Sequence, residues 1–191
     1  MDVLELIARA DERGLAASGV ACLDRCLPPP EGDADPEPLR PLWAGCGSAE
    51  RWGGLLDAAY AALEIPAGTD ETVARVRALL AAAPRDFAAG PLRAWADACS
   101  LLALDVHRAF DLPAGDGVGT AALRAAGAAG GGPLVTGELR RQTEILESLA
   151  SEPGGGLRQV LDLSTEGRRV LRAVMSRRAR GRGRPDEVSL T

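Results

Sequence analysis

The sequence has no lysine and no asparagine, one histidine and only six aromatic residues in a chain of 191. All 22 basic residues are therefore arginine. We attribute this bias to a high-GC bacterial genome, so the use of arginine in place of lysine carries no functional information. Aromatic and β-branched residues, the usual strand formers, are scarce, and no segment alternates apolar and polar residues over more than a few positions. These shortages argue against a β-sheet.

Long apolar runs are also missing, since no stretch approaches the ~20 residues that a membrane-spanning helix needs. Residues 1–9 carry acidic side chains where a secretory signal peptide has basic ones. We therefore expect a cytoplasmic protein without a membrane partner, in which the four cysteines stay reduced. A chain of this length can bury roughly 70% of its unfolded surface as one domain, without disulfides or metal.

Apolar residues recur at helical spacing along most of the chain, most clearly over residues 91–111. Pro91 suits a first helical turn and Pro113 lies just beyond the last apolar position. The same periodicity predicts helices over about 2–26, 48–64, 70–83, 118–129, 135–151 and 165–179. The sequence thus predicts an all-α fold, a single compact bundle of six or seven helices.

Two segments do not fit the helical pattern. Residues 28–47 form a Pro-rich, acidic loop after the first helix, and we expect this loop to contain no helix. Residues 177–191 are rich in arginine and glycine, which predicts a mobile basic tail. The helical bundle domain is accordingly expected to span residues 1–176.

The segment ACLDRCLPPP raises the question of a metal site, because it holds Cys22 and Cys26 four residues apart. On a helical wheel both cysteines continue the apolar stripe begun by Leu4 and Ile7, which favours burial in the core. A zinc site built from Cys22, Cys26 and Cys46 with Cys99 or His107 is the alternative. We favour core packing and predict no cofactor, since the C-x2-C pairs typical of zinc knuckles are missing.

Other motifs are candidates for a ligand or phosphate site. His107 is the single histidine, and a pocket bordered by Trp52, Trp95 and His107 is the candidate for a ligand site between helices. Two glycine-rich segments, residues 115–120 and 130–133, match neither the dinucleotide-binding pattern nor a P-loop. We interpret both segments as connectors.

The strongest charge signal lies near the C-terminus. Residues 166–184 contain eight arginines and one glutamate, whereas residues 1–165 contain 14 arginines and 24 acidic residues. Such a block is typical of contact with nucleic acid or another anionic surface. The candidates for binding a partner or an anion are Arg168, Arg169, Arg172, Arg177, Arg178 and Arg180.

Residues 163–174, LSTEGRRVLRAV, resemble the segment that follows the wing in MarR-type winged-helix repressors. The resemblance covers about a dozen residues. Because no β-wing precedes the segment and no recognition-helix pattern is visible, the sequence does not predict the function of that family.

Taken together, these patterns favour a non-catalytic protein that acts by binding another protein, as an adaptor or regulatory subunit. The first alternative is a nucleic-acid-associated regulator that uses the arginine-rich C-terminal end. The second is an enzyme or small-ligand binder with a pocket between helices, since a catalytic site can be assembled from residues distant in sequence.

Overall fold

The second helix, α2 (Glu12–Cys26), forms the centre of the molecule: every residue from Gly14 to Cys26 is buried in the computed structural model. It packs most extensively against α6 (Ala89–Phe110), and also against α8 (Pro133–Ser151) and α9 (Leu157–Arg182). Small residues permit this close packing. A Cβ atom added to Gly19 would lie 2.4 Å from Cζ3 of Trp95 on α6.

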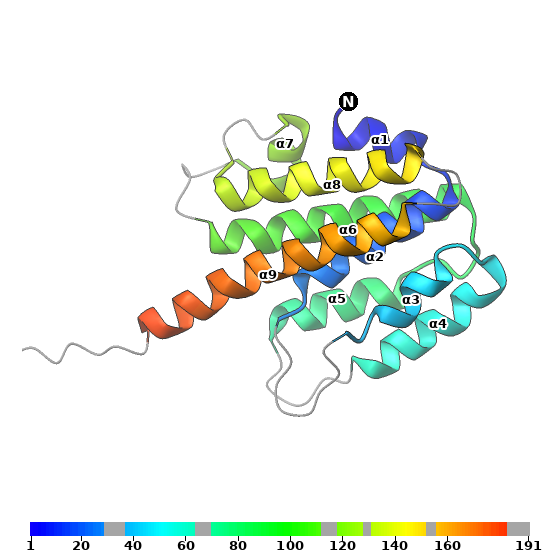
Figure 1. Cartoon of the computed structure of the whole chain (residues 1–191), viewed down its shortest axis with the longest axis horizontal. Helices are drawn as coiled ribbons and strands as arrows, with labels where there is room; N and C mark the ends of the chain where they lie inside the picture. Colours follow the sequence, from blue (N-terminus) through cyan, green and yellow to red (C-terminus); the bar gives the residue numbers. More distant parts are fainter. Residues whose placement is uncertain (29–36, 64–69, 112–117, 128–130, 152–155, 183–191) are drawn as a thin grey trace, which may run out of the picture.

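The other helices surround this centre (Figure 1). α3, α4 and α5 pack on one side of α2 and α6, whereas on the other side α1 packs against α8 and α7 packs against α6. The C-terminal part of α9 extends past the rest of the bundle. The remaining helices are α1 (Val3–Arg9), α3 (Arg40–Gly45), α4 (Ala49–Ala62), α5 (Glu71–Ala81) and α7 (Thr120–Ala125). The structure describes residues 1–28, 37–63, 70–111, 118–127, 131–151 and 156–182.

The all-α prediction is confirmed, since the described residues form helices and no strand. Most of the expected helices are present near their predicted bounds, because their ends carry local signals. Asp70 caps α5 by accepting a hydrogen bond from Thr72 N at 2.7 Å. None of the described helices is long and apolar enough to cross a membrane.

The N-terminal region differs from the prediction, which placed one helix over residues 2–26. Two helices are present, because Ala10 is extended and the Asp11 carboxylate accepts a hydrogen bond from Gly14 N at 2.7 Å to begin α2. The break changes which face of α1 is buried. Leu4, expected in the core, is exposed, while Ile7 is buried as expected.

The predicted loop over residues 28–47 also contains a helix. α3 begins within it, with Pro41 in its first turn, where the missing N–H costs no hydrogen bond. Leu42 and Trp43 of this helix are buried, whereas residues 29–36 of the loop lie outside the described residues. Because the first helix is split and α3 is present, the described part of the chain contains nine helices, whereas six or seven were predicted.

The last helix is longer than the predicted 165–179. α9 begins at Leu157 and continues to Arg182, so the first residues of the segment expected to be a mobile tail are helical. Residues 183–191 lie outside the described part of the chain. The arginine-rich end of α9 is therefore presented on a helix.

Candidate functional site

A buried ion pair joins the central helix to α8. Arg25, near the end of α2, donates from Nη2 to Oε1 of Glu138 at 2.6 Å and from Nε to Oε2 at 2.9 Å. Neither side chain is exposed to solvent. Such a bidentate pair offsets part of the cost of burying two charges.

Further polar side chains extend this pair toward α6. Gln142, one turn after Glu138 on α8, donates to Oε1 of Glu138 at 2.9 Å and accepts a hydrogen bond from Ser100 at 2.6 Å. Arg124 on α7 donates to the Ser100 hydroxyl at 3.2 Å and pairs with Asp97 at 2.8 Å. A continuous chain of hydrogen bonds thus links α2, α8, α6 and α7.

The surroundings of Arg25 and Glu138 determine the protonation state of this pair. Burial alone would raise the pKa of Glu138, but the electrostatic effects of Arg25 and His107, together with hydrogen bonds from Arg25 and Gln142, lower it to about 2. The Glu138 charge in turn helps to raise the pKa of Arg25 above its usual value, against the effect of burial. The pair is therefore ionised near neutral pH.

His107 belongs to the same cluster and is fully buried. Its Nδ1 lies 2.7 Å from the carbonyl oxygen of Ala103, which can only accept a hydrogen bond, so Nδ1 carries a proton. Nε2 lies 3.5 Å from Oε2 of Glu138 without a hydrogen bond to it. Because solvent does not reach the ring, no substrate can approach it in this conformation.

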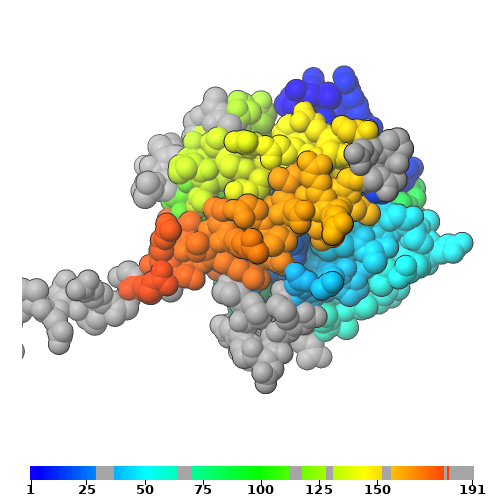
Figure 2. Space-filling view, viewed as in Figure 1, coloured from blue at the N-terminus to red at the C-terminus, as the bar shows by residue number. Residues whose placement is uncertain are grey.

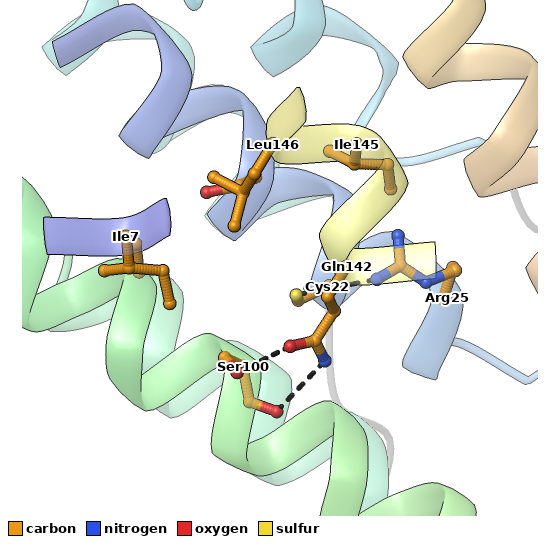
Figure 3. A pocket seen from close by; sticks show the side chains of 9 residues that line it. Ile7, Cys22, Arg25, Ser100, Gln142, Ile145 and Leu146 are labelled. Atoms are coloured by element: carbon orange, nitrogen blue, oxygen red, sulfur yellow. Dashed lines mark hydrogen bonds between the residues drawn. The ribbon is translucent and has the colours of Figure 1, made fainter. Parts of the chain in front are cut away.

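A small cavity lies beside the cluster, between α1, α2, α6 and α8 (Figure 3). Its volume of about 10 Å³ corresponds to a single water molecule. Ser18, Cys22, Ser100 and Gln142 supply polar atoms to its wall. The cavity is too small for an organic substrate.

The four cysteines are free and buried, and burial of Cys22 and Cys26 is what the core interpretation predicted. Burial raises the pKa of Cys22 to about 12 and the pKa of Cys26 and Cys99 well above the usual value. Cys99, whose pKa is also raised by its interaction with Cys22 and Cys26, is the third thiol of this group. Cys46 directly follows α3 and lies near Arg13 instead.

The zinc alternative does not match this arrangement. Among the described residues, no group of three or more histidine, cysteine, aspartate or glutamate side chains is placed to hold a metal ion. The candidate ligands Cys22, Cys26, Cys46 and His107 therefore do not converge on one point.

The two candidate pocket tryptophans meet in the core. The rings of Trp52 and Trp95 pack edge to face, with centroids 5.8 Å apart, and their Nε1 atoms donate to the carbonyls of Pro84 and Leu79, each at 2.8 Å. His107 lies twelve residues after Trp95 on α6, about 18 Å along the helix. The structure thus places the tryptophans and the histidine in separate clusters.

A second buried ion pair attaches α9 to α2. Arg168 donates to Asp24 Oδ1 at 3.0 Å and to Glu37 Oε1 at 3.1 Å, and Ser164 donates to Asp24 Oδ2 at 3.0 Å. Burial raises the pKa of Asp24 despite the opposing effects of Arg168 and Ser164. Arg168, a candidate for binding a partner, is thus used inside the molecule.

Two further candidate arginines also make internal contacts. Arg172 donates to the carbonyl of Pro28 at 3.1 Å, and Arg178 donates to carbonyls at the end of α6. Both side chains are only partly exposed.

The remaining three candidates share one exposed face of α9. Arg169, Arg177 and Arg180 lie within about 80° of one another around the helix and span about 16 Å along it. Ala173, also exposed, lies between them. Arg169 makes an exposed pair with Glu166 at 3.8 Å, whereas Arg177 and Arg180 make no ion pair with any described residue. We call these three residues the arginine stripe.

The side chains of the arginine stripe are accessible to solvent. Figure 2 shows α9 in orange and red, crossing the surface and continuing beyond the body of the molecule. Of the residues that the sequence singled out, those of the arginine stripe are thus available to a macromolecular partner.

The buried partners Arg25, Asp24 and Glu138 were not among the candidates chosen from the sequence. One signal for two of them was present. Between Gly14 and Cys26 the chain is composed of small and apolar residues except for Ser18, Asp24 and Arg25, so the helix has no polar face. Charged side chains in a helix buried on all sides require buried partners.

Comparison with known proteins gives no relative: no protein-family model, curated protein or solved structure matches the chain. The short resemblance of residues 163–174 to winged-helix repressors is not accompanied by a strand in the described residues. The geometry of the molecule is therefore the basis for a functional proposal.

Proposed function

We propose that this protein is non-catalytic and acts by binding an acidic surface of another protein through the arginine stripe. The observation that supports this proposal is the contrast within α9. Arg168, Arg172 and Arg178 are held by internal contacts, while Arg177 and Arg180 project from the same helix without an ion-pair partner in the described chain.

The chemistry of arginine favours carboxylates as the target. A guanidinium group offers a planar set of donors that matches a carboxylate or a phosphate in a bidentate pair. The stripe lies on a continuous helix, so its cations keep a fixed spacing without the entropy cost of ordering a loop.

An acidic protein fits the charge distribution better than a nucleic acid does. Residues 1–165 carry a net charge of −10, and an extended polyanion lying along α9 would also meet this body. No aromatic side chain lies on the exposed face between Arg169 and Arg180 to stack on bases. A protein surface can present acidic groups to the stripe alone.

Affinity capture with three forms of the full chain tests this proposal. The first is the wild type, the second carries Arg169→Ala, Arg177→Ala and Arg180→Ala, and the third carries three alanines at arginines on other exposed surfaces. Arg9, Arg51 and Arg140 serve as these control positions because they are exposed, lie on helices other than α9, and change the net charge equally.

We expect the wild type and the control variant to retain the same acidic protein from a nuclease-treated extract, and the stripe variant to lose it. Identification by mass spectrometry and reconstitution with the purified partner would support the proposal. Retention of that protein by the stripe variant would contradict it. Recovery of nucleic acid in place of protein from a parallel extract without nuclease treatment would favour the nucleic-acid alternative.

A further inference from the structure

Arg178 lies between Arg177 and Arg180 but points toward the bundle. Its Nη1 donates to the carbonyl of Ala109 at 2.9 Å, and its Nη2 donates to the carbonyls of Phe110 at 2.9 Å and Asp111 at 3.0 Å. The guanidinium also lies 5.4 Å from the centroid of the Phe110 ring. One side chain thus contacts three consecutive residues at the end of α6.

These carbonyls belong to the end of a helix, where the last carbonyl groups have no N–H partner within the helix and carry partial negative charge. A cation that donates to several of them therefore makes a favourable contact. Lysine could not reproduce this geometry. All N–H donors of its ammonium group lie on one nitrogen atom, whereas the guanidinium group donates from several nitrogen atoms held in one plane.

The same end of α6 also holds α8. The Asp111 carboxylate accepts hydrogen bonds from Leu134 N and Val135 N, each at 3.0 Å, which caps the first turn of α8. A Cβ atom at Gly132 would lie 2.4 Å from the Asp111 carboxyl carbon, so only glycine allows this close approach. The contact of Arg178 is thus made with a fixed junction of two helices rather than with a mobile loop.

The neighbouring stripe residues lack such contacts. Arg177 and Arg180 are exposed and form no ion pair with a described residue, and the last turns of α9 extend beyond the bundle (Figure 1). Isolated helical turns are marginal in water, so a contact to the bundle is needed to hold these residues in a helix.

We infer that Arg178 is the positioning residue of the arginine stripe: its contacts with the end of α6 hold the last turns of α9 helical, and thereby present Arg177 and Arg180 to an acidic partner in a fixed arrangement. The functional part of this inference rests on the proposed binding of acidic proteins. Its physical basis is preorganisation, since binding cations that are already ordered costs less conformational entropy.

The test compares Arg178→Ala with Arg177→Ala in the full chain, because both remove one positive charge from adjacent positions. The first readout is amide hydrogen exchange over residues 176–182. The second is binding of poly-L-glutamate, measured by fluorescence anisotropy at fixed ionic strength. Arg178→Lys, which keeps the charge, is the third variant.

We expect Arg178→Ala to speed exchange in the last turns of α9 by roughly tenfold or more, because it removes hydrogen bonds from a charged donor. Arg177→Ala should leave exchange close to the wild-type rate. Binding of poly-L-glutamate should weaken more in Arg178→Ala than in Arg177→Ala, and Arg178→Lys should restore it only in part.

Unchanged exchange in Arg178→Ala would overturn the inference, as would equal binding losses in the two alanine variants. If poly-L-glutamate does not bind the wild type, the proposed acid-binding function fails, and the exchange rates still decide whether Arg178 orders the end of α9. A purely electrostatic role predicts full rescue of binding by Arg178→Lys, which would also contradict the inference.

Discussion

Arg25 and Glu138, 113 residues apart in the sequence, form a completely buried ion pair that is closed by two hydrogen bonds of 2.9 and 2.6 Å. The pair joins the central helix α2 to α8 within a network that also includes Gln142 and Ser100. The cost of burying two charges can offset the attraction between them, so a buried pair need not stabilise the fold in total. The loss of one partner, however, leaves an uncompensated charge in the core. The stability of the fold should therefore depend strongly on each member.

The first prediction concerns Glu138→Gln, which removes the charge that faces Arg25. We expect it to lower the free energy of unfolding by about 3–5 kcal/mol, measured by urea denaturation at neutral pH. Glu144→Gln is the matched control on the same helix. It breaks an exposed pair with Arg140 and should cost less than about 1 kcal/mol. Similar losses in the two variants would contradict a special role for the buried pair.

The pH dependence of this effect has a defined sign. The pKa of Glu138 falls from 4.5 to about 2 in the folded protein, so its ionised form stabilises the fold above about pH 4.5. This contribution is lost as the pH falls toward 2. The stability difference between the wild type and Glu138→Gln should accordingly shrink from pH 5 toward pH 2, as urea titrations at several pH values would show. A difference that stays constant over this range would refute the assignment.

The attachment of α9 to α2 is tested by removing Arg168. Arg168→Ala leaves the buried Asp24 carboxylate without its cation, and we expect a loss of roughly 3 kcal/mol in the free energy of unfolding. Arg169→Ala, at the adjacent exposed position, should change stability by less than about 0.5 kcal/mol. Thermal denaturation of both variants distinguishes them, and equal midpoints would argue against the ion pair as the attachment of this helix.

Gly167 marks the place where α9 crosses the Arg25 side chain. A Cβ atom there would lie 2.4 Å from Cδ of Arg25 and 2.9 Å from Cδ of Arg141. Gly167→Ala should therefore destabilise the protein by about 1–3 kcal/mol. Gly54→Ala on α4, where a Cβ meets no atom within 4 Å, should instead stabilise by roughly 0.5–1 kcal/mol. Stabilisation by both substitutions would show that α9 does not pack closely on Arg25.

The cysteines provide a test of core packing without mutation. Burial raises the pKa of all four thiols, so that they are protonated near neutral pH and shielded from reagents. We expect almost no reaction with Ellman's reagent in the folded protein at pH 7, and four reactive thiols in guanidinium chloride. Rapid labelling of one thiol in the folded state would show that its region opens locally.

Much of the helical layout followed from local signals in the sequence. The apolar stripe and flanking prolines around residues 91–111 predicted α6 to within two residues at its start and one at its end. The split between α1 and α2 was missed, because an aspartate at position 11 is compatible with both a helix interior and an N-cap. α3 was missed because its short apolar segment lies among prolines, where packing of Leu42 and Trp43 outweighs local preference.

The candidate site was less predictable than the fold. The arginine block was visible in the sequence, but six arginines of one helix could not be divided by composition into those that pair inside the molecule and those that face solvent. Arg168 differs from Arg169 only in the direction of its side chain around α9, and that direction is set by the contact of α9 with α2.

The sequence by itself determined the helical class, most helix ends and the burial of Cys22 and Cys26, because periodicity and capping act over a few neighbouring residues. The tertiary structure decided which distant charges meet, such as Arg25 with Glu138 and Arg168 with Asp24. It also decided that Cys99, rather than Cys46, approaches Cys22 and Cys26. The physical reason is that the neighbours of a buried charge or thiol are set by how whole helices pack together. The residues adjacent in the sequence do not determine that packing.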